Sequence, residues 1–239
     1  MKLSIIIPCR DEFENVSVIT NDIINNLNTS NYEIIFINDY SNDNTEEKLK
    51  SLSLKYEKIK YYNNQNKGLG GAIKLGLEKF NGDYVAILMA DSADSISDLN
   101  EYYNIIQNDE TDAVFGSRFI KGGKTVNYPA LKLILNRIAN NFIRLLFFSR
   151  YNDFTNSFKI YKKNTIKFLY PLISENFNIF LELSLKTIVR GFKIKIIPIS
   201  YTNRTIGVAK FKIKEVGSSY LFTALYCFLE KILLDKKVK

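Results

Sequence analysis

Short runs of apolar residues alternate with amphipathic segments along the first half of the chain. Apolar runs bounded by polar residues predict buried strands, and apolar residues recurring at helical spacing predict helices. The expected strands are residues 3–8, 32–38, 59–63, 84–89 and 113–116. The expected helices are residues 16–27, 45–56, 72–80 and 97–107. This alternation predicts an α/β fold with a mostly parallel central sheet flanked by helices.

The pattern changes after residue 120, where the amphipathic segments become longer. We expect helices over residues 131–148, 178–190 and 213–234, and strands over 158–161 and 193–201. Pro198 cannot donate a backbone hydrogen bond, so the second of these strands is expected at a sheet edge. No repeat or linker interrupts the pattern. We therefore expect one domain over residues 1–212, followed by an amphipathic C-terminal helix within 213–239.

The composition restricts the possible chemistry. None of the 239 residues is a histidine, which excludes histidine-dependent catalytic triads and histidine metal sites. Cys9 and Cys227 are far apart in sequence, so they suggest no disulfide framework and fit a reducing compartment. The net charge of +8 is compatible with nucleic acid, anionic lipid or a phosphorylated substrate as partner. On charge alone, we favour a solvated basic surface.

The sequence gives no sign of a membrane-spanning segment. The first residues, MKLSIIIPCRDE, have an apolar run too short for a signal peptide, and no stretch is long enough to cross a bilayer. The C-terminal helix carries apolar residues on one face, followed by Lys236 and Lys237. These apolar residues are Leu221, Phe222, Leu225, Phe228, Leu229, Ile232 and Leu233. Such a face either lies in a membrane interface or packs on the domain.

Polar residues cluster where the expected parallel strands end. Ligands of open α/β sheets bind at this edge, so these residues are candidates for a site. They are Arg10, Asp11 and Glu12 after the first strand, Asp39 after the second, Asp91 and Asp94 after the fourth, and Arg118 after the fifth.

A glycine-rich segment, Gly68-Leu69-Gly70-Gly71, follows the third strand. It is a poor match to a dinucleotide-binding loop, because the third glycine of that motif would fall at Ile73 and the motif normally follows the first strand. A tight turn into a helix explains these glycines at least as well as phosphate binding does.

Asp91 and Asp94 are candidate ligands for Mg²⁺ or Mn²⁺. These hard cations take one or two protein carboxylates together with phosphate oxygens of a substrate. The alternative is that Asp94 only caps the helix that follows it. Further along, Arg204 and Lys210 flank Gly207, which suits either a phosphate-gripping loop or a charged surface loop.

Taken together, these segments resemble family 2 glycosyltransferases of the GT-A fold, in particular the dolichyl-phosphate mannosyltransferase-like branch that uses polyprenyl phosphates. The matching segments keep the family order: SIIIPCRDE at 4–12, FINDYSNDNT at 36–45, NKGLG at 66–70, GDY at 82–84, GSRF at 116–119, DFTNSFK at 153–159 and RTIGVAK at 204–210. Asn38 and Tyr40 replace an Asp and a Gly of the family's nucleoside turn, and ADSAD at 90–94 replaces the usual Asp-x-Asp.

The resemblance implies a UDP- or GDP-sugar donor and a divalent metal ion. Metal binding would fall to Asp91 and Asp94, and catalytic roles to Asp91, Arg118, Arg204 and Lys210. The donor would contact Pro8, Arg10, Glu12, Asp39, Lys67, Gly68 and Asp91.

The resemblance also implies an anionic acceptor. The Gln-x-x-Arg-Trp motif of polysaccharide-building relatives is absent, since the chain has no tryptophan. A polyprenyl phosphate, attacking with inversion, needs no general base but needs cations. The candidates are Arg118, Lys132, Arg137 and Arg204.

This interpretation places the protein in the cytoplasm, peripherally on the cytoplasmic membrane face, with no nucleic acid as partner. Transfer to a saccharide hydroxyl, and a catalytically inactive nucleotide-binding relative, are the alternatives.

Overall fold

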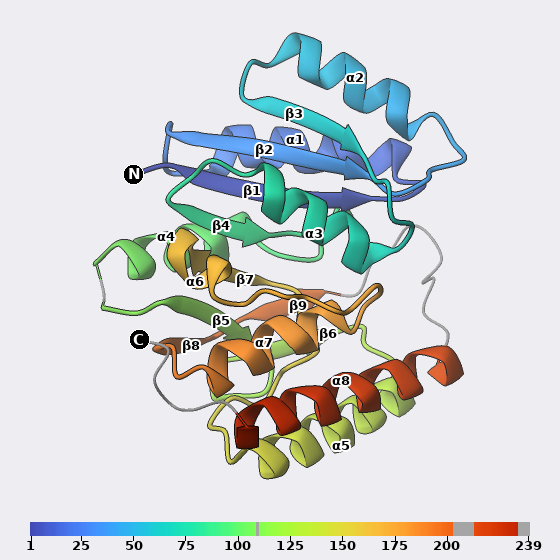
Figure 1. Ribbon diagram of the computed structural model, residues 1–239. Coiled ribbons are helices and arrows are strands. Elements are labelled where there is room, and N and C mark those ends of the chain that lie inside the picture. The colour runs from blue at the N-terminus through green and yellow to red at the C-terminus, as the bar shows by residue number, and fades with distance from the viewer. Residues whose placement is uncertain (109, 203–212, 234–239) are drawn as a thin grey trace.

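The computed structural model describes residues 1–108, 110–202 and 213–233, with the side chains of 202 and 213–216 excepted. Seven strands form the central sheet in the order β3-β2-β1-β4-β7-β5-β8. Only β7 runs antiparallel to its neighbours within this sheet. The strands of the central sheet are β1 (Leu3–Cys9), β2 (Tyr32–Asn38), β3 (Ile59–Asn63), β4 (Tyr84–Ile87), β5 (Ala113–Ser117), β7 (Lys159–Lys162) and β8 (Ile194–Pro198). The expected α/β fold with a mostly parallel sheet is confirmed (Figure 1).

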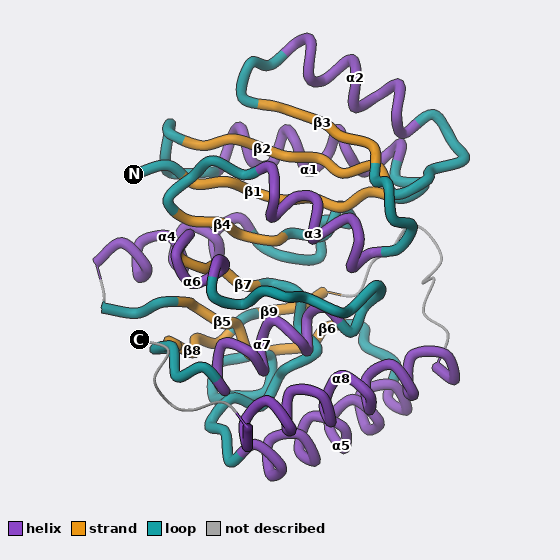
Figure 2. Tube along the Cα trace, in the orientation of Figure 1, coloured by secondary structure: helices purple, strands orange, loops and turns teal. Residues whose placement is uncertain are grey.

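Helices cover both faces of this sheet (Figures 1 and 2). The described helices are α1 (Phe13–Asn26), α2 (Thr45–Lys55), α3 (Leu69–Lys79), α4 (Ile96–Asn108), α5 (Ala130–Phe147), α6 (Lys163–Lys167), α7 (Ile179–Val189) and α8 (Ile213–Leu233). Helices α1, α2 and α4 share one hydrophobic core with the sheet, and α3, α6 and α7 share the other. Adjacent residues of β1 enter opposite cores, because side chains alternate across a strand: Ile5 packs in the first and Ile6 in the second.

The two long helices α5 and α8 lie beside each other and add Ile143, Phe147, Ala224 and Cys227 to the second core (Figure 1). Phe147 and Phe228 meet edge to face, with ring centroids 6.0 Å apart. Lys231 donates a hydrogen bond to the carbonyl of Phe147. On α8, Thr223, Ala224 and Cys227 are buried. Part of the C-terminal helix therefore packs on the domain, which is one of the two arrangements expected for it.

The single strand expected over residues 193–201 was wrong at its C-terminal end. The chain forms β8 at an edge of the main sheet, as Pro198 predicted, and then changes sheets. Ile199 donates to the carbonyl of Ser117 and accepts from the amide of Lys124, so the next residues pair elsewhere. They form β9 (Ser200–Thr202), which runs parallel to β6 (Lys124–Val126) in a separate small sheet that the sequence did not predict.

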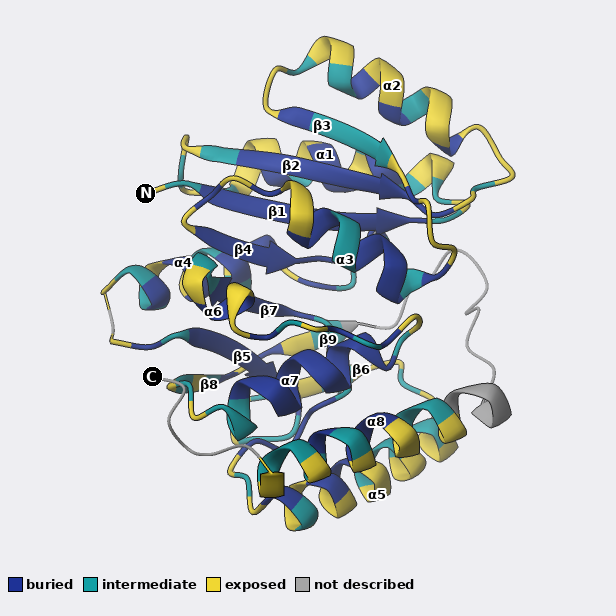
Figure 3. Cartoon of the chain, in the orientation of Figure 1, coloured by how far each residue is buried: buried dark blue, intermediate teal, exposed yellow. Residues whose placement is uncertain are grey.

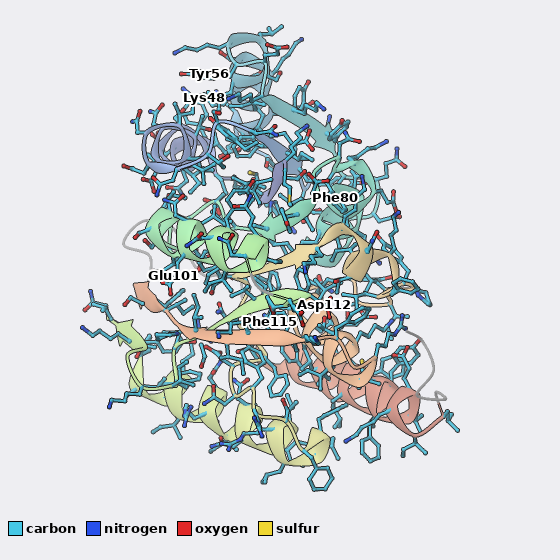
Figure 4. The ribbon with its side chains drawn as sticks, turned by 90° about the vertical axis from the view of Figure 1, so that its left-hand side faces the viewer. Lys48, Tyr56, Phe80, Glu101, Asp112 and Phe115 are labelled. Carbon is cyan, nitrogen blue, oxygen red and sulfur yellow. The ribbon has the colours of Figure 1, made fainter. Side chains whose placement is uncertain are left out.

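Other element boundaries differ by a few residues. Helix α1 begins at Phe13 instead of 16, and α3 begins at Leu69 instead of 72. Figure 4 shows the sheet from the side. Lys48 and Tyr56 lie at the end that carries α2, and Phe115 lies on β5 in the interior.

A buried carboxylate joins the amino-terminal ends of the strands. Glu33 of β2 accepts hydrogen bonds from the Ser4 hydroxyl at 2.7 Å and the Asn81 amide at 2.8 Å, and pairs with Lys2 and Lys60. Burial alone would raise the pKa of Glu33, but these hydrogen bonds lower it to about 2.

We predict that Glu33→Gln destabilises the protein by about 1–2 kcal/mol at pH 7, because the variant loses charge-assisted hydrogen bonds. The loss stays small because solvent screens the lysine partners. A depressed carboxyl pKa stabilises the fold above the unfolded value of about 4.3, and this contribution disappears as the pH falls through about 2. Urea unfolding at pH 7, 4 and 2.5 should show the difference between variant and wild type shrinking as the pH falls. A constant difference would contradict the ionic origin.

Candidate active site

The turns after β1 and β2 are joined directly to each other. Asp11, at φ 53°, accepts a hydrogen bond from the amide of Asn42 at 2.7 Å. The amide of Glu12 donates to the hydroxyl of Thr45 at 2.9 Å. These bonds hold residues 10–12 against the turn that follows Asp39. The structure therefore brings together the first two groups of residues expected to contact a donor.

Asp39 is the junction between these turns and the glycine-rich segment. Its amide donates to the carbonyl of Cys9 at 2.7 Å. Its buried carboxylate accepts from the amide of Gly68 and from the side chain of Asn64, both at 2.8 Å. Lys67 is exposed beside this junction, with its ammonium 5.8 Å from the centre of the Tyr40 ring. The expected donor residues Asp39, Lys67 and Gly68 thus lie at one end of the sheet.

The glycines of residues 68–71 are required by close backbone packing. The amide of Gly70 donates to the carbonyl of Glu175 at 2.8 Å. A Cβ on Gly70 would lie 2.4 Å from the carbonyl oxygen of Ser174, and a Cβ on Gly68 would lie 2.5 Å from that of Glu175. Gly68 also has φ 124°, which disfavours any other residue. Contact with residues 174 and 175 and the positive φ of Gly68 thus account for Gly68 and Gly70.

The turn after β4 carries two acidic side chains. Asp91 is partly exposed, and its carboxylate accepts from the amide of Ala93 at 3.2 Å. Ser92 takes φ 53°, which reverses the chain and brings Asp94 back toward Asp91. Burial and then the nearby charge of Asp91 raise the pKa of Asp94 to about 7. Among the described residues, Oδ2 of this buried carboxylate has no hydrogen-bond partner.

These two carboxylates fit a cation site completed by a phosphorylated substrate. A nearby positive charge would relieve the repulsion that raises the pKa of Asp94. The described residues contain no group of three or more Asp, Glu, Cys or His side chains that could hold a metal ion alone. A divalent ion at Asp91 and Asp94 would therefore take its remaining oxygen ligands from phosphate or water.

Arg118 is buried at the end of β5 and paired with Asp153. Its Nε and Nη2 donate to the two carboxylate oxygens at 2.8 and 2.6 Å, and its backbone amide donates to the same carboxylate at 3.0 Å. Burial alone would lower the pKa of Arg118, but Asp153 raises it above its ordinary value. Arg118 therefore remains a cation whose charge Asp153 largely balances.

Aromatic rings connect Arg118 with the other expected acceptor cations. The guanidinium carbon of Arg118 lies 5.1 Å from the Phe119 ring centre, and that of Arg137 lies 4.5 Å from the same ring. The rings of Tyr128 and Tyr201 also flank Arg118, and Lys132 contacts the Tyr128 ring. Arg118, Lys132 and Arg137 are thus gathered on one side of the site. Arg204 and Lys210 lie outside the described residues.

The sequence analysis did not assign a role to several residues around Arg118. Lys159 of β7 is buried, and burial lowers its pKa to about 7, although Asp153 acts in the opposite direction. Its ammonium donates to the carbonyl of Asn156. Asp153 and Lys159 both belong to the segment DFTNSFK, so the family motif was the available signal for them. Tyr128 and Tyr201 had no such signal, because β6 and β9 were not correctly predicted.

A mostly parallel sheet flanked by helices, with acidic residues at the carboxyl ends of its strands, is the architecture of the GT-A glycosyltransferase class. A family model described as glycosyl transferase family 2 matches residues 4–170. The chain belongs to this family.

Two curated relatives align over most of the chain. Dolichol-phosphate mannosyltransferase from Pyrococcus furiosus is 30% identical over 218 residues, which cover 90% of this chain and 61% of that protein. Polyprenol monophosphomannose synthase from Mycolicibacterium smegmatis is 26% identical over 229 residues, which cover 89% of this chain and 86% of that protein. The chain thus spans less than two thirds of the Pyrococcus relative.

Solved structures of the same fold come from glucosyl-3-phosphoglycerate synthase of Mycobacterium tuberculosis. Its complex with Mn²⁺, UDP-glucose and phosphoglyceric acid has a TM-score of 0.73 at 13% identity, covering 95% of this chain and 79% of that one. The complex with Mn²⁺, UDP and glucosyl-3-phosphoglycerate has a TM-score of 0.71 at 12% identity, covering 99% and 81%. At this identity the likeness concerns the fold.

We predict that Asp94→Asn raises the stability of the protein in EDTA at pH 8 by roughly 1–3 kcal/mol. A raised carboxyl pKa means that ionisation destabilises the fold, and this cost develops as the pH rises from about 4 to about 7. Thermal unfolding from pH 4 to 8 should show the variant gaining on the wild type as the pH rises. Mn²⁺ should then stabilise the wild type more than the variant. A variant that is less stable than wild type at pH 8 in EDTA would contradict the prediction.

Proposed function

We propose that the chain transfers a sugar, with inversion, from a UDP- or GDP-sugar to a polyprenyl phosphate. The observation that carries the proposal is its similarity, along about nine tenths of its length, to two enzymes named for polyprenol phosphates. The clustered acids, the neighbouring cations and an exposed apolar face support it.

The donor occupies the carboxyl edge of β1, β2 and β4 in this proposal. Residues 8–12 and Asp39 border the nucleoside, and Lys67 and Gly68 lie next to it. Asp91 and Asp94 hold a divalent ion, with Mg²⁺ and Mn²⁺ both compatible with carboxylate ligands. When bound, this ion supplies positive charge that stabilises the diphosphate as a leaving group. The chain's own residues fix the donor's orientation relative to the cation cluster.

The acceptor phosphate lies on the side of Arg118, Lys132 and Arg137. Its ionised oxygen attacks the anomeric carbon as the bond to the nucleoside diphosphate breaks, which forms a phosphodiester-linked sugar without a general base. Asp153 already balances Arg118, so Arg137 carries more of the electrostatic attraction. Among the described residues, Nη1 of Arg137 is buried without a hydrogen-bond partner. Arg204 and Lys210 join this group in the proposal.

An apolar face on α5 and α8 suits the membrane in which such a lipid is dissolved. Six large apolar residues of α5 are at least 45% exposed and share one side of the helix: Leu131, Ile134, Leu135, Ile138, Phe142 and Leu145. Six of α8 are at least 50% exposed: Leu221, Phe222, Leu225, Leu229, Ile232 and Leu233. Figure 3 shows that exposed positions run along both helices.

Single exposed apolar residues are common on protein surfaces, but a group of this size on two neighbouring helices indicates an interaction surface. No helix among the described residues is long and apolar enough to cross a membrane. We therefore propose that α5 and α8 lie in the lipid interface, with the protein on the cytoplasmic face.

We predict transfer to a short-chain polyprenyl phosphate and none to the matching neutral polyprenol, since only the phosphate arrives ionised. Release of nucleoside diphosphate, measured for several UDP- and GDP-sugars, gives the readout. EDTA should abolish turnover, and activity should fall as salt screens the attraction, which extends over about 10 Å at 0.1 M ionic strength. Efficient transfer to a free saccharide hydroxyl, with no response to polyprenyl phosphate, would overturn the acceptor assignment.

We predict that Phe142→Glu combined with Leu229→Glu reduces binding to anionic lipid vesicles at least about tenfold, because charged residues are costly in the apolar interface. Leu54→Glu is the matched control, since Leu54 is 81% exposed on α2, away from this face. Vesicle sedimentation measures the binding, and transfer to a detergent-dispersed acceptor checks that the site is intact. Equal vesicle binding by all three proteins would contradict a membrane role for this face.

A further inference from the structure

A fully buried ion pair lies on α7, away from the acids and cations described above. Glu182 and Lys186 each have 0% side-chain exposure, and Nζ of Lys186 lies 3.0 Å from Oε1 of Glu182. The Glu182 carboxylate also accepts from the amides of Ile173 and Ser174, at 2.8–3.1 Å. Lys186 donates in addition to the carbonyl of Pro171. Every one of these extra bonds goes to the backbone of the segment preceding α7.

Stability alone does not account for such a pair. Removing two charges from water is expensive, and well-packed apolar residues are often as stabilising as a buried ion pair. A carboxylate with several directed hydrogen bonds, by contrast, allows the bonded backbone only one position. The pair therefore determines where residues 171–176 lie relative to α7.

Residues 171–176 in turn support the glycine-rich segment. The carbonyl of Glu175 accepts from the amide of Gly70, and the missing side chains of Gly68 and Gly70 allow direct backbone contact with Ser174 and Glu175. The amide of Gly68 then donates to the carboxylate of Asp39. A displacement of Ser174 would thus reach Asp39 through one tight contact, one backbone–backbone hydrogen bond and one hydrogen bond from a backbone amide to the Asp39 side chain.

We propose that Glu182 and Lys186 are positioning residues for donor binding, which act by holding residues 171–176 against residues 68–70 and so setting the position of Asp39. This inference rests on the proposed donor site. It assigns a role in substrate affinity to two side chains that contact no substrate.

The segment has other supports, so removing the pair shifts it without unfolding the domain. Asn178 donates to the hydroxyl of Thr223 on α8 at 2.9 Å, and the Ser174 hydroxyl lies 3.5 Å from the same atom. Leu172 and Ile179 remain in the second hydrophobic core.

The test compares Glu182→Gln, the double variant Glu182→Gln/Lys186→Met, and the wild type. Glu182→Gln alone leaves the buried Lys186 without a counter-charge and is expected to be poorly folded, so the neutral double variant is the main test. The glutamine oxygen of the double variant is uncharged and accepts weaker hydrogen bonds than the carboxylate, so the amides of Ile173 and Ser174 are held less firmly. Thr187→Val is the control, because Thr187 is buried on the same helix and, within the described part of the chain, its hydroxyl bonds only to the carbonyl of Leu183, at 2.6 Å.

The positioning role predicts a donor KM at least about fivefold higher in the double variant, with kcat at saturating donor within about twofold of wild type. The amide of Gly70 should also lose protection in hydrogen exchange without any ligand. Thr187→Val should change neither value. A variant that loses stability but keeps the donor KM and the Gly70 protection would overturn the inference. A wild-type protein that binds no nucleotide would instead overturn the donor assignment. The Gly70 exchange measurement would still test the positioning of residues 68–70, because it needs no ligand.

Discussion

The carboxylate of Asp39 joins three segments that are distant in sequence and form one side of the site. Its amide is tied to the end of β1, and its side chain accepts hydrogen bonds from Asn64 and Gly68. A buried carboxylate needs such partners, because an unpaired charge in the protein interior is very costly. The arrangement of the first three strand ends therefore depends on this one group.

Charge is distributed unevenly across the rest of the site. On one side, Asp91 and Asp94 repel each other, so this region favours a cation. On the other side, Asp153 balances Arg118, and Arg137 extends the positive region past Phe119. Under the proposed function, this arrangement would give the metal-bound diphosphate and the acceptor phosphate separate positive regions.

Much of this could be predicted from the sequence, because strand and helix periodicity is local and the family motifs keep their order. The five parallel strands and the positions of Asp39, Asp91 and Arg118 after β2, β4 and β5 followed from that pattern. Pairings between distant segments could not be predicted in this way. Periodicity did not indicate that Asp153 would neutralise Arg118, that β9 would leave the main sheet for β6, or that residues 171–176 would contact Gly70.

The packing of α8 sets an order of events during protein synthesis. Thr223, Ala224 and Cys227 complete the second core and the hydrogen bonds of Ser174 and Asn178, yet they are translated after every other described element. A nascent chain that has already formed β1 to β5 still lacks this support and exposes the apolar surface that α8 covers. Such exposed surfaces are prone to aggregation. Ser174 and Asn178 therefore reach their final hydrogen bonding only after α8 has been synthesised and has packed.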